Sequence, residues 1–134
     1  MKASWSPAMV SCLLIENNPE ERQRIHAMLE TFGISVEMRA AASDALGFCR
    51  EQRPQLIIME ATEQPATKEI LRLAGYSAEK RGGQGNPVVI LYTDHPDMDD
   101  MGASILAGAS EFLVKPFDQR LLHFKLEQAG VLAH

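Results

Sequence analysis

The sequence predicts one α/β domain, in which a parallel sheet of five strands carries helices on both faces. Five short apolar runs alternate along the chain with segments of helical periodicity, which indicates five β-α units in a row. The runs are too apolar to leave one face in water, as is typical of strands buried inside a parallel sheet. The 134 residues suffice for one substantial core. We expect this domain to span residues 10–134, with residues 1–9 as a loose arm.

The five predicted strands are the apolar runs themselves. Continuous runs at 12–15 (CLLI), 56–59 (LIIM) and 88–93 (VVILYT) predict strands in the sheet interior. The weak alternation at 34–40 (ISVEMRA) predicts the second strand, and 108–116 (GASEFLVKP) carries the fifth.

The first helix has clear start and stop signals. Asn18 is a predicted N-cap, Pro19 takes the first helical position, and Gly33 ends the helix. Its apolar residues recur at helical spacing and predict one buried face, made of Ile25, Met28, Leu29 and Phe32.

The other helices follow the same logic. Ser43 is predicted to cap a second helix through Arg50, and further helices are expected over 67–80, 96–107 and 118–129. The predicted core side of the third is Ile70, Leu71, Leu73 and Ala74, and that of the last is Leu121, Leu122 and Leu126.

Composition excludes several classes of function. A balance of 13 basic against 18 acidic residues argues against nucleic acid or an anionic membrane as the main partner. No window approaches the ~18 apolar residues of a membrane span, and the N-terminus does not resemble a signal peptide. Cys12 and Cys49 lack paired spacing, so we expect reduced thiols in a cytoplasmic protein. The four histidines and the acidic stretch at 94–100 lack metal-ligand spacing.

Polar side chains follow four of the predicted strands. In open parallel sheets, ligands bind outside the carboxyl ends of the strands. The first strand leads to Glu16 and Asn17, the third to Glu60, the fourth to Thr93 and the fifth to Lys115. Two acids, an amide, a hydroxyl and an ammonium are therefore expected on one rim.

Four segments together resemble the receiver domain of bacterial two-component response regulators. They are LLIENNPEER at 13–22, RPQLIIME at 53–60, VVILYT at 88–93 and AGASEFLVKPF at 107–117, and they occur in the family's order. The resemblance extends over about 10–132 and implies the flavodoxin-like, doubly wound (βα)5 fold.

The resemblance also implies a chemistry. In this family an Asp accepts a phosphoryl group from a kinase His, acids hold Mg²⁺, and a Lys and a Thr grip the phosphoryl oxygens. Carried over by position, the phosphoacceptor equivalent is Glu60, the acidic-pocket equivalents are Glu16 and Asn17, and the switch and phosphate-grip equivalents are Thr93, Phe112 and Lys115.

Two of these positions depart from the family pattern. Asn17 replaces an acid by a neutral amide, so we expect Mg²⁺ binding to be weak or lost and no other metal or cofactor to bind. Glu60 replaces the accepting Asp and is one methylene longer, and a displacement of ~1 Å at a reacting centre can cost ~10²-fold in rate. We therefore expect no phosphorylation, and a permanent Glu60–Lys115 pair in place of the phosphate.

The predicted function is that of a stand-alone, atypical pseudo-receiver that is not an enzyme and works through protein–protein interaction. Its partner would be a protein such as a histidine kinase, a phosphotransferase or a downstream regulator, docked around Met101, Ile105, Phe112 and Phe117. One alternative is a residual phosphoacceptor or phosphate shuttle in a phosphorelay. Another is a flavodoxin-like cofactor binder, which the acidic loop at 16–22 disfavours.

Overall fold

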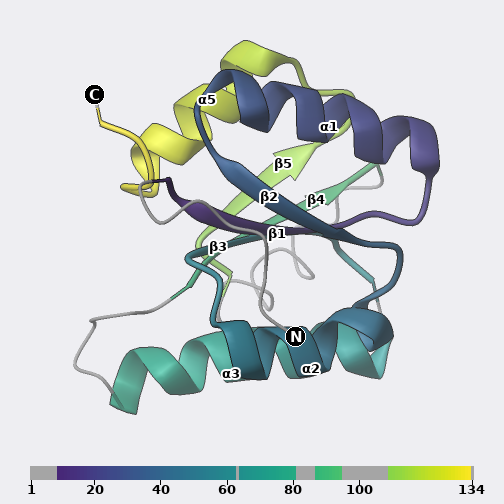
Figure 1. Cartoon of the computed structure of the whole chain (residues 1–134), viewed down its shortest axis with the longest axis vertical. Helices are drawn as coiled ribbons and strands as arrows, with labels where there is room; N and C mark the ends of the chain where they lie inside the picture. Colours follow the sequence, from purple (N-terminus) through teal and green to yellow (C-terminus); the bar gives the residue numbers. More distant parts are fainter. Residues whose placement is uncertain (1–8, 63, 81–86, 95–108, 134) are drawn as a thin grey trace.

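A computed structural model describes residues 9–62, 64–80, 87–94 and 109–133 of the chain. The predicted helix over 96–107, most of the glycine-rich loop and the first eight residues of the predicted arm lie outside the described residues. In Figure 1 the strands form a central layer, with α1 and α5 on one face and α2 and α3 on the other. The predicted α/β architecture with helices on both faces is confirmed.

The sheet holds five parallel strands in the order β2-β1-β3-β4-β5. This is the flavodoxin-like order. The strand order changes direction between β1 and β3, and such a switch point leaves a binding crevice at the carboxyl ends of these two strands. The strands are β1 (Ser11–Ile15), β2 (Ser35–Arg39), β3 (Leu56–Glu60), β4 (Val88–Thr93) and β5 (Glu111–Val114).

Helix α1 (Pro19–Thr31) begins and ends as the sequence predicts. The Asn18 side chain accepts a hydrogen bond from the Glu21 amide at 3.0 Å, which satisfies one of the free N–H groups of the first turn. Gly33 follows the helix with φ of 77°, a conformation that costs glycine little and other residues more. The cap residues therefore fix where the chain leaves and re-enters the sheet.

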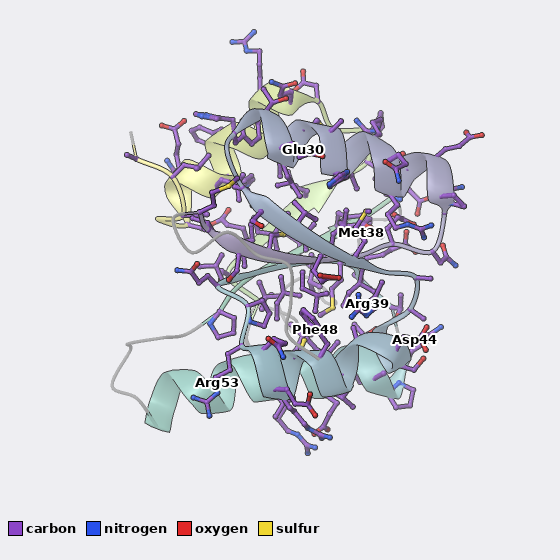
Figure 2. The ribbon with its side chains drawn as sticks, viewed as in Figure 1. Glu30, Met38, Arg39, Asp44, Phe48 and Arg53 are labelled. Atoms are coloured by element: carbon purple, nitrogen blue, oxygen red, sulfur yellow. The ribbon has the colours of Figure 1, made fainter. Side chains whose placement is uncertain are left out.

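Helix α2 (Ala42–Gln52) corrects one prediction. Its N-cap is Ala41, in extended backbone, and Ser43 lies inside the first turn instead of capping it. No side-chain cap hydrogen bond marks this helix start, and the Arg39 guanidinium at the end of β2 lies 4.7 Å from the centroid of the Phe48 ring in α2 (Figure 2).

The two remaining helices differ from prediction only in detail. Helix α3 (Pro65–Lys80) starts two residues earlier than predicted, with proline at its first position. Helix α5 (Gln119–Gln128) is capped by Asp118, whose side chain accepts from the Leu121 amide at 2.9 Å. Leu121 itself was predicted to pack inward, but its side chain is 39% exposed. Leu122 and Leu126, one turn apart, are buried as predicted, and Leu121 lies on the outer side of that stripe.

The core consists of one hydrophobic cluster on each face of the sheet. Along β1, Cys12 and Leu14 pack towards α1 and α5, whereas Leu13 and Ile15 pack towards α2 and α3. This alternation within a continuous apolar run is what a strand covered on both faces requires.

The two cysteines are free thiols, as predicted. Cys12 is fully buried and Cys49 partly so. Burial raises the pKa of both thiols, that of Cys49 to about 12, so neither is a reactive thiolate at neutral pH.

Within the described residues no helix combines the length and apolar composition needed to cross a bilayer.

Candidate functional site

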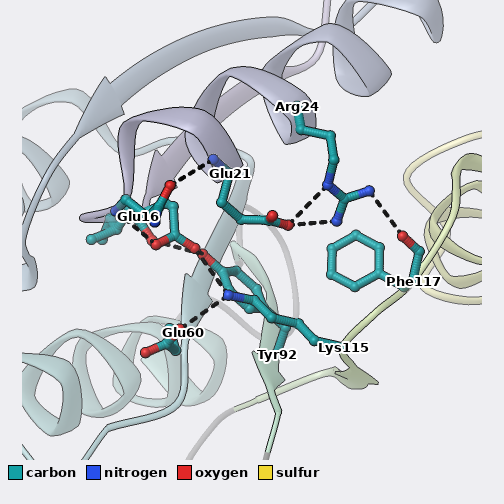
Figure 3. A network of polar contacts seen from close by, with 9 residues as sticks. Glu16, Glu21, Arg24, Glu60, Tyr92, Lys115 and Phe117 are labelled. Atoms are coloured by element: carbon teal, nitrogen blue, oxygen red, sulfur yellow. Dashed lines mark hydrogen bonds and ion pairs between the residues drawn. The ribbon is translucent and has the colours of Figure 1, made fainter.

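The carboxyl ends of β1, β3, β4 and β5 bring four polar side chains into contact. Figure 3 shows Glu16 from the end of β1, Glu60 from β3, Tyr92 from β4 and Lys115 from beyond β5 around one point. Three of these residues were named from the sequence as rim residues. The fourth, Tyr92, was not.

Lys115 is the centre of this arrangement. Its ammonium Nζ lies 3.2 Å from Glu60 Oε2 and 3.4 Å from Glu16 Oε1, and 4.7 Å from the centroid of the Tyr92 ring (Figure 3). Burial alone would lower the pKa of Lys115, but the hydrogen bond to Glu60 and the charges of both carboxylates outweigh it, so that pKa is raised. The lysine is thus a permanent cation shared between two acids.

Glu16 is the most enclosed charged group of the site, with a side chain only 2% exposed. Its Oε1 accepts the Tyr92 hydroxyl at 2.5 Å, and its Oε2 accepts the Asn18 amide at 3.0 Å. Its backbone carbonyl accepts Arg22 Nη1 at 2.8 Å. Both carboxylate oxygens are therefore engaged within the protein, as a buried charge requires.

Tyr92 is the residue of this site that the sequence analysis did not name. It is fully buried, and burial followed by the hydrogen bond to Glu16 raises its pKa, so the phenol remains a neutral donor at ordinary pH. The sequence did carry a signal, because a tyrosine inside a buried strand needs a hydrogen-bond partner for its hydroxyl. In VVILYT it was counted with the apolar run instead.

The structure also places three further residues that the sequence predicted for the site. Thr93 ends β4, and its carbonyl accepts the Lys115 amide at 2.7 Å, which ties the segment after β5 to β4. Asn17 is exposed and, with Glu16 and Glu60, lines a hollow of about 140 Å³ between the ends of β1 and β3. Phe112, 9% exposed, packs in the cluster facing α2 and α3.

The predicted docking surface needs correction. Phe117 is 4% exposed, and its ring centroid lies 6.0 Å from that of Tyr92. The Arg24 guanidinium covers this ring at 5.2 Å, and Arg24 Nη1 donates to the Phe117 carbonyl at 3.0 Å (Figure 3). Phe117 therefore links the segment before α5 to α1 and is not available to a partner. Met101 and Ile105 lie outside the described residues.

The donor set of the rim does not fit a divalent cation. Mg²⁺ requires about six oxygen ligands in near-octahedral geometry. Both carboxylate oxygens of Glu16 already accept hydrogen bonds, Asn17 offers a neutral amide, and Glu60 Oε2 is bound to Lys115. Among the described residues, no group of three or more His, Cys, Asp or Glu is placed to hold a metal ion.

Sequence comparisons identify the family of this chain. The family described as "Response regulator receiver domain" matches residues 12–127. Protein PilH of Pseudomonas aeruginosa is 26% identical over 119 residues, which cover 85% of this chain and 92% of PilH. The transcriptional regulatory protein AfsQ1 of Streptomyces coelicolor is 29% identical over 119 residues, which cover 88% of this chain but only 50% of AfsQ1.

Solved structures give the same fold. The chemotaxis protein CheY4 of Vibrio cholerae matches with a TM-score of 0.74 and 21% identity, covering 91% of this chain and 99% of that one. The signal receiver domain of a histidine kinase from Syntrophus aciditrophicus matches with a TM-score of 0.70 and 25% identity, covering 92% and 94%. The co-crystal structure of Saccharomyces cerevisiae Ypd1 with the receiver domain of Ssk1 contains a chain that matches with a TM-score of 0.76 and 19% identity, covering 91% and 89%. The family match covers nearly the whole chain, and this protein therefore belongs to the response regulator receiver domain family of two-component signalling.

Proposed function

We propose that this chain is an atypical receiver domain that takes up no phosphoryl group and signals by binding another protein in a fixed setting. The observation that carries the proposal is the position of Lys115, whose ammonium lies within 3.4 Å of two carboxylates. In a phosphorylated receiver this lysine would grip the phosphoryl group. Here a built-in carboxylate, Glu60, stands in that place.

Charge supports this proposal. A phosphoryl group carries about −1.5 to −2 at neutral pH. It would arrive beside Glu16 and Glu60, and the Lys115 ammonium already pairs with both carboxylates. Because the rim donors do not fit a divalent cation, the added charge would lack the metal that usually neutralises it in phosphoryl transfer.

A surface for the partner lies on α5. Leu121 and Phe124 are 39% and 51% exposed and are three positions apart, so they share one side of the helix. Large apolar side chains in this position suit a protein partner such as a kinase, a phosphotransferase or a downstream regulator. In the proposed docking surface, Leu121 and Phe124 take the place of the predicted Phe112 and Phe117, whose side chains are buried.

The competing function is that of a phosphoacceptor or phosphate shuttle. One observation favours it: the Glu60 side chain is 43% exposed, and its Oε1 has no described bond. A small phosphodonor could reach this oxygen.

Incubation with acetyl phosphate and Mg²⁺, followed by intact-mass measurement, separates the two functions. We expect no change in mass, and the same set of proteins captured from a lysate of the source cells before and after treatment. An acid-labile gain of one phosphoryl group that disappears in Glu60→Ala would establish the phosphoacceptor instead. Glu60→Asp is the matched variant, because it restores the shorter acid and keeps the charge.

A further inference from the structure

Tyr92 holds Glu16 from inside the sheet. Its hydroxyl lies 2.5 Å from Glu16 Oε1, and the Ile15 carbonyl, at 3.3 Å, is a more distant second acceptor. The ring is fully buried, with Phe117 against it and Lys115 above it. A ring fixed on these sides keeps its hydroxyl aimed at one carboxylate oxygen.

We propose that the Tyr92 hydroxyl occupies Glu16 in place of a divalent cation and so makes the rim independent of metal. This inference deepens the proposed function and rests on it. A cation that approached Glu16 would have to displace the hydroxyl, and a buried hydroxyl without a good partner is costly. It would also have to enter beside the Lys115 ammonium, 3.4 Å from the same oxygen.

The same bond explains how Lys115 keeps its place without metal or phosphate. Tyr92 and the Asn18 amide together hold the Glu16 carboxylate in one orientation. Lys115 is attracted to this fixed anion and to the face of the Tyr92 ring. Tyr92 is thus a positioning residue that acts through Glu16.

Two features of the rim are separable on this view. Asn17 lacks the charge of a second acid, and the Tyr92 hydroxyl occupies an oxygen of the first acid, Glu16. Asn17→Asp restores the charge but leaves the Glu16 carboxylate bonded to the Tyr92 hydroxyl. Only the further removal of that hydroxyl frees the carboxylate to bind a cation. Tyr92→Phe is the matched change, because it removes one oxygen and keeps the ring that Phe117 and Lys115 contact.

The test is a Mg²⁺ titration of Asn17→Asp and of Asn17→Asp/Tyr92→Phe, followed by amide NMR at residues 16, 17 and 60. We expect the double variant to bind Mg²⁺ at least ten-fold more tightly than the single variant, which corresponds to about 1.4 kcal/mol. Equal affinity in the two variants, or no binding by the double variant, would overturn the proposal.

A second measurement needs no substitution at Tyr92 and serves if the double variant does not fold. In Asn17→Asp, the hydroxyl proton of Tyr92 should keep its NMR signal and its contact with Glu16 at millimolar Mg²⁺. Loss of that signal as Mg²⁺ binds would show that the hydroxyl does not exclude the cation. Neither result bears on the proposed function, which is tested by phosphoryl uptake and protein capture with the unmodified chain.

Discussion

The two carboxylates that share Lys115 should contribute unequally to the stability of the fold. Glu60 Oε2 is the nearer, at 3.2 Å against 3.4 Å for Glu16 Oε1, but the Glu60 side chain is 43% exposed and that of Glu16 only 2%. The shorter distance thus favours Glu60 as the stronger partner of Lys115, whereas burial favours Glu16. We expect burial to decide, because water screens the exposed pair.

Coulomb's law sets the scale of the difference. Unit charges at the Glu60–Lys115 distance attract by roughly 1 kcal/mol in a medium like water, and those at the Glu16–Lys115 distance by about 5 kcal/mol at an effective dielectric constant of 20. Desolvation and side-chain entropy reduce both values. We therefore expect coupling energies of about 0.2–1 kcal/mol for Lys115 with Glu60 and about 1.5 kcal/mol or more for Lys115 with Glu16.

Two double-mutant cycles measure these energies. The variants are Lys115→Met, Glu60→Gln, Glu16→Gln and the two double variants with Lys115→Met, each unfolded in urea and followed by circular dichroism. Methionine keeps most of the lysine stem over the Tyr92 ring and removes the ammonium, with its charge and its hydrogen bonds to both carboxylates. With a urea dependence of about 2 kcal/mol/M, a coupling of 1 kcal/mol moves the midpoint by about 0.5 M. A coupling with Glu60 as large as that with Glu16 would refute the reasoning.

Two further predictions concern the fold around the site. The pKa values of Tyr92 and Lys115 are raised, which means that the folded state holds their protons more tightly than the unfolded state does. Their contribution to the free energy of unfolding is therefore full below pH 10.0, the ordinary pKa of tyrosine, and is lost as pH rises above that value. Urea midpoints should therefore fall above about pH 10, less steeply in Tyr92→Phe, and a midpoint that stays flat to about pH 11 would contradict this. Asn18→Ala should lower the free energy of unfolding by about 1 kcal/mol through loss of the α1 cap. Asn17→Ala, at an exposed neighbour with no described side-chain bond, should change it by less than about 0.5 kcal/mol, and equal effects would show that the cap is unimportant.

Much of the fold follows from local sequence. The order of apolar runs and helical segments is enough for a parallel sheet with helices on both faces, since parallel strands need crossover helices between them. Asn18 and Gly33 mark the ends of α1 because their chemistry acts within a few residues. The helix starts that the sequence misplaced are at α2 and α3, and the start of α2 has no side-chain cap hydrogen bond to mark it.

The sequence also determined that Glu16, Glu60 and Lys115 share a rim, since the carboxyl ends of parallel strands meet at one edge of the sheet. Only the tertiary structure decided that Tyr92 holds Glu16 and that Phe117 is buried under Arg24. These contacts join segments far apart in the chain, and a one-residue difference in position changes which face of the sheet a side chain meets. The residues at the site can be listed from strand ends, but the partner each one takes depends on how the strand ends and the covering helices pack together.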